Sequence, residues 1–131
     1  MRLKNVLLIV RDIEKSKAFY HDLFDMHVVT DFGKNVILTE GLVLEERALW
    51  ENSIGKTVKF CGNDKELYFE TFDFDGFIRR LTESKYPVEY VTAPDCEKAE
   101  CEEERKRRVI RIYDPDRHMI EVAESINKRE P

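Results

Sequence analysis

The sequence predicts an α+β fold in which a β-α-β-β-β module is followed by a second module of the same order. Three observations lead to this prediction. Apolar segments of strand length alternate with two amphipathic segments of helix length. A capping aspartate precedes each helical segment, Asp12 in the first half and Asp73 in the second. The segments around these helices recur in the same order, which indicates an internal repeat.

The first module extends over about residues 3–53. Its opening segment, 3–10, is apolar and rich in branched residues, which suits a strand buried on both faces. The segment after Asp12 places its apolar residues mostly on one helical stripe, at positions 13, 19, 20, 23 and 24. Short apolar runs separated by single glycines then predict a meander. Its strands are expected over 26–30, 36–39 and 42–45, followed by a short helix over 46–53.

The second module extends over about residues 64–124, and the two modules together are expected to form a single domain, 1–131. A strand over 66–72 precedes a helix over 75–84, whose apolar stripe contains Phe77, Ile78 and Leu81. The segment 114–117 reads Asp-Pro-Asp-Arg, which is typical of a turn. The remaining strands are expected over 88–91, 108–113 and 118–122, and the charged segment 92–106 as a solvated loop or hairpin tip.

Length and composition limit the class of protein. A chain of 131 residues suits one compact domain, and its net charge of −5 disfavours a general nucleic-acid binder. The apolar run 6–10 is far shorter than the roughly 20 residues of a transmembrane helix, and no signal-peptide pattern opens the chain. Three cysteines at irregular spacing, Cys61, Cys96 and Cys101, argue against a disulfide framework or a zinc knuckle. We therefore expect a cytoplasmic protein with reduced thiols and no membrane contact.

Three segments carry a family resemblance: VLLIVRDIEKSKAFY at 6–20, ELYFETFDFD at 66–75 and YDPDRHMIEV at 113–122. In this order they resemble the vicinal oxygen chelate superfamily, which contains glyoxalase I, bleomycin-resistance proteins, fosfomycin-resistance enzymes and extradiol dioxygenases. The match covers roughly residues 3–122. The resemblance implies a curved, partly open mixed sheet around a cleft, with helices on the convex side. It also implies a homodimer, because two chains can complete two clefts.

Strand alternation sorts the side chains that would face such a cleft. Asn5, Leu7 and Ile9 would share one face of the first strand. Glu66, Tyr68, Glu70 and Phe72 would share a face of the fifth, as would Met119 and Glu121 on the last. The strand over 107–113 would turn its odd-numbered residues toward the cleft, and Ile110 and Ile112 toward a helix.

The resemblance also implies a metal site, because the superfamily binds its ion from the first and last strands of both modules. Carried over by position, the ligands are Asn5, Glu45, Glu66 and Glu121. The internal repeat pairs Asn5 with Glu66 and Glu45 with Glu121. None of the three histidines, His21, His27 and His118, falls on a ligand position.

An amide and three carboxylates form an all-oxygen set that suits Mg²⁺, Mn²⁺ or Ca²⁺ better than zinc. The expected cofactor is therefore at most one divalent ion, with Mg²⁺, Mn²⁺, Ni²⁺ and Zn²⁺ unresolved. Without an ion, the convergent carboxylates would repel one another and raise each other's pKa. Three states of the site stay open: a bound metal, a protonated carboxylate, or a basic partner such as Arg111.

Three functions follow from the resemblance. The first is a divalent-metal-dependent lyase or isomerase acting on an α-keto or vicinal-oxygen substrate, with Glu121 or Glu66 as the base. The second is a metal-free protein that binds and sequesters a small molecule, as bleomycin-resistance proteins do. The third is a protein–protein module. Extradiol dioxygenase activity is not expected, because the two histidine ligands of its iron are absent.

Further side chains are candidates for ligand contact. Tyr68, Phe72 and Tyr113 could stack on a ligand or fill the cleft wall. Arg111 could bind an anionic group or pair with a glutamate, and Glu70 shares the face of Tyr68. Arg117 stands at a turn position where this family usually has glycine, and a positive φ there would cost about 1 kcal/mol. His118 is expected to be structural.

Overall fold

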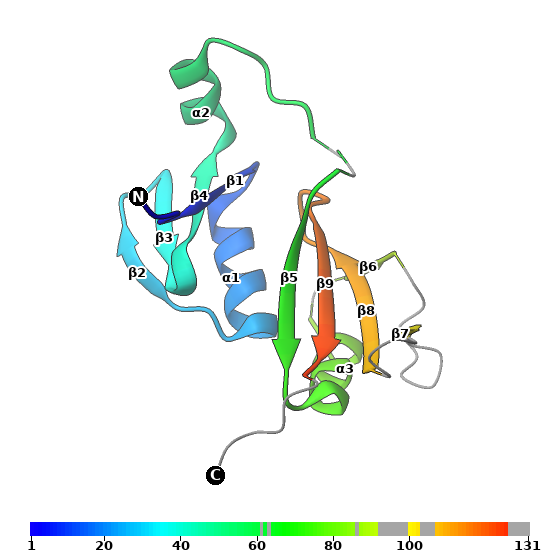
Figure 1. Cartoon of the computed structure of the whole chain (residues 1–131). Coiled ribbons are helices and arrows are strands. Elements are labelled where there is room, and N and C mark those ends of the chain that lie inside the picture. The colour runs from blue at the N-terminus through cyan, green and yellow to red at the C-terminus, as the bar shows by residue number, and fades with distance from the viewer. Residues whose placement is uncertain (61, 63, 86, 92–99, 103–106, 126–131) are drawn as a thin grey trace. The chain divides into compact units, whose positions relative to one another are not determined.

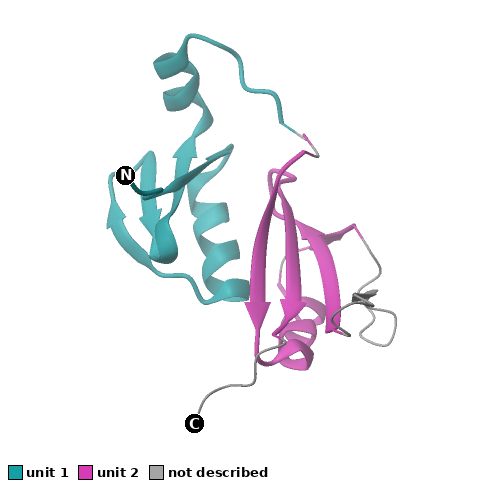
Figure 2. Ribbon diagram, viewed as in Figure 1, with its two compact units in different colours: residues 1–60 teal, residues 61–131 magenta. Residues whose placement is uncertain are grey.

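The structure is a computed structural model that describes residues 1–60, 62, 64–85, 87–91, 100–102 and 107–125. The chain divides into two compact units, Met1–Phe60 and Cys61–Pro131, and each is described by itself (Figure 2). The predicted modules, 3–53 and 64–124, fall within these units, and the single domain over 1–131 stays a prediction. Among the described residues, no helix is long and apolar enough to cross a membrane.

Unit 1 has the predicted β-α-β-β-β order (Figure 1). Its sheet has the strand order β1-β4-β3-β2, in which β1 and β4 are parallel and the other pairs antiparallel. The opening strand begins only at Val6, three residues later than predicted. The short helix predicted over 46–53 is confirmed. The elements are β1 (Val6–Val10), α1 (Ile13–Phe24), β2 (Val28–Asp31), β3 (Asn35–Leu38), a 3-10 turn (Thr39–Gly41), β4 (Leu42–Glu46) and α2 (Arg47–Ile54).

Unit 2 repeats this order, and its sheet follows the same plan, β5-β9-β8-β6, with β5 and β9 parallel. The α+β class and the repeated module order are therefore confirmed. One additional short strand, β7, pairs antiparallel with β8 inside the segment predicted as a loop. The rest of that segment and the three cysteine side chains lie outside the described residues. The elements are β5 (Glu66–Thr71), α3 (Phe74–Thr82), β6 (Glu89–Tyr90), β7 (Glu100–Glu102), β8 (Arg107–Tyr113) and β9 (Met119–Glu124).

Both longer helices begin at the predicted aspartate. The Asp12 carboxylate accepts a hydrogen bond from the backbone N–H of Lys15 at 3.1 Å, and Asp73 accepts one from Gly76 at 3.0 Å. Each bond satisfies one of the donors that a helix leaves unpaired at its first turn. A Cβ atom at Gly76 would lie 2.1 Å from Asp73 Oδ2, so the observed rotamer of Asp73 leaves room only for glycine at this position.

The predicted apolar stripes form the core of each unit. In unit 1, the buried residues of α1 belong to a core that also includes buried side chains of β1, β3 and β4. In unit 2, the core contains the buried residues of α3 together with those of β8 and β9. Burial of such side chains is the main stabilising contribution to folding. The largest fully buried apolar side chains are Val10, Tyr20, Val36, Leu38 and Leu44 in unit 1 and Phe74, Phe77, Ile110, Ile112, Ile120 and Val122 in unit 2.

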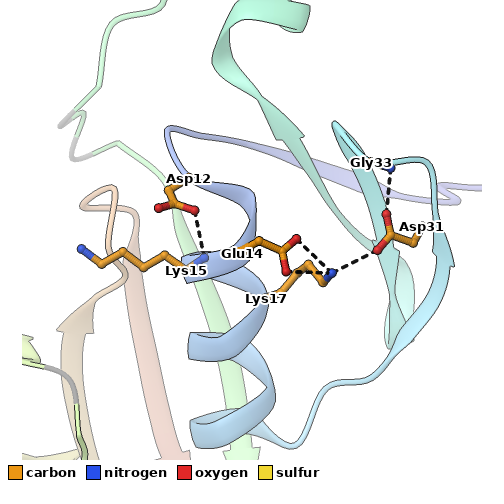
Figure 3. Close-up of polar contacts among 6 residues, drawn as sticks. All are labelled: Asp12, Glu14, Lys15, Lys17, Asp31 and Gly33. Carbon is orange, nitrogen blue, oxygen red and sulfur yellow. Dashed lines mark hydrogen bonds and ion pairs between the residues drawn. The ribbon is translucent and has the colours of Figure 1, made fainter.

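An ion-pair network connects α1 to the edge strand β2. Lys17 Nζ lies 3.0 Å from Asp31 Oδ2 and 3.2 Å from Glu14 Oε2 (Figure 3). Asp31 also accepts a hydrogen bond from the backbone N–H of Gly33 at 2.7 Å. This bond, followed by the Lys17 ammonium, lowers the pKa of the Asp31 carboxyl. Because these groups are exposed, the network contributes modestly to stability.

The predicted turn at 114–117 is confirmed. The buried Asp114 carboxylate accepts hydrogen bonds from the backbone N–H groups of Asp116 at 2.9 Å and His118 at 2.8 Å. His118 Nδ1 also lies 2.6 Å from Asp114 Oδ2, which gives the imidazole the structural role expected of it. Arg117 adopts the left-handed conformation with φ of 66°. Its side chain pairs with Glu89 and lies over the Tyr113 ring, which offsets part of the strain.

Candidate functional site

The sheet of unit 2 has one face packed against α3 and one face turned away from it. Arg108 on β8 pairs with Asp75 of α3 at 2.8 Å, which places the even-numbered residues of β8 on the α3 side. The odd-numbered residues, together with their partners on β5 and β9, lie on the opposite face. We call this the open face of unit 2. It carries Glu66, Tyr68, Glu70, Arg107, Val109, Arg111, Tyr113, Met119, Glu121 and Ala123, as strand alternation predicted.

An arginine and two glutamates form the centre of the open face. Arg111 and Glu121 are direct partners across β8 and β9, and Arg111 Nη2 lies 2.6 Å from Glu121 Oε1. The Nε atom of Arg111 lies 3.9 Å from Glu66 Oε1 on β5. Glu121 on β9 is opposite Tyr68 on β5, so Glu66 is the diagonal neighbour of Glu121 across these two parallel strands. Long side chains at such diagonal positions are close enough to meet. One guanidinium thus contacts both predicted catalytic carboxylates.

Glu66 is electrostatically unlike an ordinary surface glutamate. Burial is the largest cause that raises the pKa of its carboxyl, and the neighbouring Glu121 charge raises it further. A hydrogen bond with the Glu121 carboxyl acts in the same direction, whereas Arg111 opposes the shift. Of the states left open by the sequence, a basic partner is the one that the contacts of Arg111 with Glu66 and Glu121 favour.

A second arginine lies on the same face. Arg107 is 4% exposed at its side chain, and its Nη1 lies 3.3 Å from Glu70 Oε2. Its guanidinium carbon lies 5.5 Å from the centre of the Tyr68 ring. The Tyr68 side chain remains largely accessible, because the residue is 46% exposed. The sequence placed Arg107 toward the cleft but did not identify it as a partner of Glu70. The pattern that could have identified this pair is that Arg107 and Arg111 are both odd-numbered residues of β8 and so lie on the same face as Glu70.

The other two predicted aromatic contacts lie near the border of this face. Tyr113 is half-buried at the end of β8, with the Arg117 guanidinium 4.4 Å from its ring centre. Phe72 is 56% exposed and lies just beyond the end of β5, which stops at Thr71 rather than at the predicted residue 72. Tyr68 is therefore the predicted aromatic residue placed nearest to Glu66, Arg111 and Glu121.

In unit 1, the two predicted metal ligands lie far from each other. Asn5 is next to Gly41, because a Cβ atom at Gly41 would lie 3.8 Å from Asn5 Cα. Glu45 is opposite Ile9, four residues further along the parallel strands. At about 3.3 Å per residue, this separates the two backbone positions by about 13 Å. Metal–oxygen bonds of about 2.0–2.6 Å leave one ion unable to contact both side chains.

The register therefore changes the pairing that the internal repeat suggested. In unit 2, Met119 lies opposite Glu66, two residues before Glu121. In unit 1, Gly41 lies beside Asn5, the residue that the repeat pairs with Glu66, and Val43 follows two residues later. The unit 1 counterpart of Glu121 is then Val43, not Glu45. Glu45 instead accepts a hydrogen bond from the Asn35 side-chain amide at 2.8 Å, a partner that sequence reasoning missed. Only the antiparallel register of β3 and β4 brings these two residues together.

The donor set does not fit a shared metal ion. Asn5 and Glu45 are too far apart, and the Glu121 carboxylate is already paired with the Arg111 guanidinium. Among the described residues, no group of three or more His, Cys, Asp or Glu side chains is arranged to hold a metal ion. In the residues present, Arg111 supplies the positive charge that a cation would bring to Glu66 and Glu121.

Comparisons with known proteins agree with the fold. A profile of the glyoxalase-like domain matches residues 3–127. A crystal structure of a protein of unknown function from Agrobacterium tumefaciens str. C58 is 34% identical, with a TM-score of 0.79, and the match covers 95% of this chain and 94% of that one. No curated protein matches the chain.

More distant structures share the fold alone. A genomically encoded fosfomycin resistance protein, FosX, from Listeria monocytogenes is 20% identical with a TM-score of 0.68, covering 99% of this chain and 95% of that one. A lactoylglutathione lyase from Agrobacterium tumefaciens is 20% identical with a TM-score of 0.66, covering 95% and 93%.

Proposed function

The chain belongs to the glyoxalase-like domain family, and from this premise we propose that it binds a small molecule on the open face of unit 2 without a divalent metal ion. The observation that carries the proposal is the contact of 2.6 Å between Arg111 and Glu121. A guanidinium is always charged and presents several donors in a fixed plane. It therefore offers a ligand oriented hydrogen bonds at the position where a metal ion would otherwise act.

The charges of the open face favour a cationic ligand. Three carboxyl groups, Glu66, Glu70 and Glu121, share this face with two guanidinium groups, Arg107 and Arg111. Glu121 and Glu70 each have an arginine partner within 3.3 Å, whereas the Arg111 contact of Glu66 is longer, at 3.9 Å. A ligand cation placed beside Glu66 would favour its ionised form. The accessible ring of Tyr68 suits an aromatic or apolar part of the same ligand.

Thermal melts with small charged probes test this proposal. Benzamidine, benzoate and benzyl alcohol share one ring and differ in charge. Benzamidine is expected to raise the melting temperature, because a ligand at 100 times its Kd adds about 2.7 kcal/mol. Glu66→Gln should remove this shift, and the matched substitution Glu83→Gln, at the end of α3, should preserve it. The shift should be unchanged by Mg²⁺, Mn²⁺ or EDTA.

Two results would count against the proposal. Preference for benzoate over benzamidine would reverse the predicted charge of the ligand. A benzamidine shift that requires Mg²⁺ or Mn²⁺, and that is lost in Glu121→Gln, would indicate that an ion acts at the open face despite Arg111.

A second candidate is proton-transfer catalysis, as in a lyase or isomerase acting on an α-keto or vicinal-oxygen substrate. The observation that favours it is the raised pKa of Glu66, because a base works best when its pKa lies near the working pH. Between the two predicted catalytic residues, Glu66 is the better base, since Glu121 is held by Arg111. An assay with an α-keto hemithioacetal, comparing the protein with Glu66→Gln, tests this candidate. Turnover that is lost in this variant would favour catalysis over sequestration.

We also propose the homodimer and the cytoplasmic location that the sequence suggested. Two chains of a fold with an open sheet face can complete two sites by symmetry. Light scattering coupled to gel filtration tests the assembly, and a particle of one chain's mass at high concentration would contradict it. Fractionation of the source cells tests the location.

A further inference from the structure

Two histidines meet on the surface of unit 1. His21 lies in the last turn of α1, and His27 lies just before β2. Their ring centres are 5.4 Å apart, and the ring planes are nearly perpendicular at 82°. Both side chains are 60% exposed, so they are accessible without any rearrangement of the core.

The end of α1 brings the two rings together. Asp25 adopts the left-handed conformation with φ of 56°, which is uncommon for a residue other than glycine. Its backbone N–H donates to the His21 carbonyl at 3.1 Å, and the N–H of Met26 donates to the Tyr20 carbonyl at 3.2 Å. These two bonds close the helix and reverse the chain, so that His27 returns to the turn that carries His21.

Each imidazole has its own carboxylate. His21 Nδ1 lies 3.0 Å from Asp22 Oδ1, and His27 Nε2 lies 3.2 Å from Asp25 Oδ1. Among the described residues, the second ring nitrogen of each histidine, Nε2 of His21 and Nδ1 of His27, makes no hydrogen bond. A carboxylate on one nitrogen orients the ring and makes the other nitrogen a better metal ligand.

We infer that His21 and His27 form a binding site for a divalent transition metal ion of the zinc, nickel and copper class. Imidazole nitrogens suit these ions, whereas Mg²⁺ and Ca²⁺ prefer oxygen ligands. With metal–nitrogen bonds of about 2.0–2.1 Å, two imidazoles around a tetrahedral ion have ring centres about 5 Å apart. The observed spacing of 5.4 Å fits this arrangement.

The protein supplies two nitrogen ligands to this site, and water fills the other positions. Such a site binds its ion more weakly than a cage of three or four side chains. The carboxylates of Asp22 and Asp25 add negative charge beside the site, which favours a cation. The inference does not depend on the proposed function of the open face, because all four residues belong to unit 1.

The histidine NMR signals of the whole chain provide a direct test, because the sequence contains only three histidines. The cysteines are first blocked with iodoacetamide, since thiolates also bind zinc. On titration with Cu²⁺ or Ni²⁺, the signals of His21 and His27 should broaden at lower metal concentration than that of His118. His118 serves as an internal control, because it has no histidine neighbour among the described residues and its side chain is only 25% exposed.

Zinc titration of variants by calorimetry provides a second test. His21→Asn and His27→Asn should each lower the zinc affinity at least about tenfold. Asp25→Asn should also lower the zinc affinity, because it removes the carboxylate that orients the His27 ring. Asparagine also tolerates the left-handed conformation, so Asp25→Asn keeps the end of the helix. Equal broadening of all three histidines, or unchanged zinc affinity in the two histidine variants, would overturn the inference.

Discussion

The sheets of the two units share one strand order but carry different chemistry on corresponding positions. In each unit the first and last strands are parallel neighbours, and the helix begins at a capping aspartate. In unit 2, this parallel pair carries Glu66, Tyr68 and Glu121 on its open face, and β8 adds Arg111. In unit 1, Val43 stands where Glu121 stands, and Glu45 is paired with Asn35 instead.

The comparison shows that the repeat preserves the strand plan while individual register positions determine the chemistry. Glu45 lies two residues further along β4 than Val43, the residue that corresponds to Glu121 of unit 2. The helices differ in a similar way. In unit 1, Lys17 on α1 reaches Asp31, whereas in unit 2 Arg108 on β8 reaches both Asp75 of α3 and Glu124 of β9. Different charged residues thus connect the helix to the sheet in the two units.

The largest expected effects come from substitutions in the apolar core, which each unit has for itself. Leu44 and Ile120 are both 0% exposed, on the last strand of unit 1 and unit 2. Leu44→Ala and Ile120→Ala are each expected to lower the free energy of unfolding by about 2–5 kcal/mol, because each leaves a cavity. Urea unfolding followed by circular dichroism measures the loss. A loss below about 1 kcal/mol for either variant would show that its site is less well packed than the burial indicates.

The next effect is specific to unit 2. Arg111→Leu leaves the mostly buried Glu121 carboxylate without its partner and should lower the free energy of unfolding by about 1–3 kcal/mol. The double variant with Glu121→Gln should recover part of this loss, because the unpaired charge is gone. Asn35→Ala in unit 1 removes a neutral donor to Glu45 and should cost less, about 1 kcal/mol. Equal losses for Arg111→Leu and Asn35→Ala would remove the electrostatic distinction between the two sheets.

A smaller difference is expected at the start of the two helices. Gly76→Ala places a Cβ atom 2.1 Å from Asp73 Oδ2, which breaks the cap and should cost about 1 kcal/mol. The equivalent substitution in unit 1, Lys15→Ala, keeps the backbone donor to Asp12 and should change stability little. Thermal unfolding of both variants measures the contrast. Comparable melting temperatures for the two would mean that Asp73 finds another rotamer that still caps α3.

The smallest expected effect is the pH dependence due to Glu66. Burial and Glu121 raise the pKa of Glu66 above its ordinary value of 4.5, so the folded state keeps a proton that the unfolded state has lost. Stability from this group is therefore greatest below pH 4.5 and falls as pH rises through the raised pKa. Glu66→Gln should stabilise the protein relative to the parent at pH 7 more than at pH 4, by less than about 1 kcal/mol because the side chain is partly exposed.

Melting temperatures measured across this pH range, with Glu83→Gln as the matched control, test this sign. A Glu66→Gln variant that is less stable than the parent at pH 7, with the deficit disappearing toward pH 4, would mean that Arg111, rather than burial, dominates the environment of Glu66.

The sequence alone determined most of the fold because its signals are local. Asp12 and Asp73 mark the helix starts through a bond to a backbone donor three residues later, and the apolar stripes of α1 and α3 follow the helical period. Alternation along β8 also placed Arg111 and Ile112 on opposite faces. Each of these features depends only on neighbours within a few residues along the chain.

Only the tertiary structure decided which of the predicted site residues meet. Strand register sets the contact of Arg111 with Glu121 and separates Asn5 from Glu45, and no local pattern fixes how far one strand slides along another. The meeting of His21 with His27 is local in sequence, but it depends on a left-handed Asp25 that the sequence analysis did not predict. The physical reason is that side-chain chemistry at a site depends on pairings between distant segments, whereas secondary structure depends mainly on near neighbours.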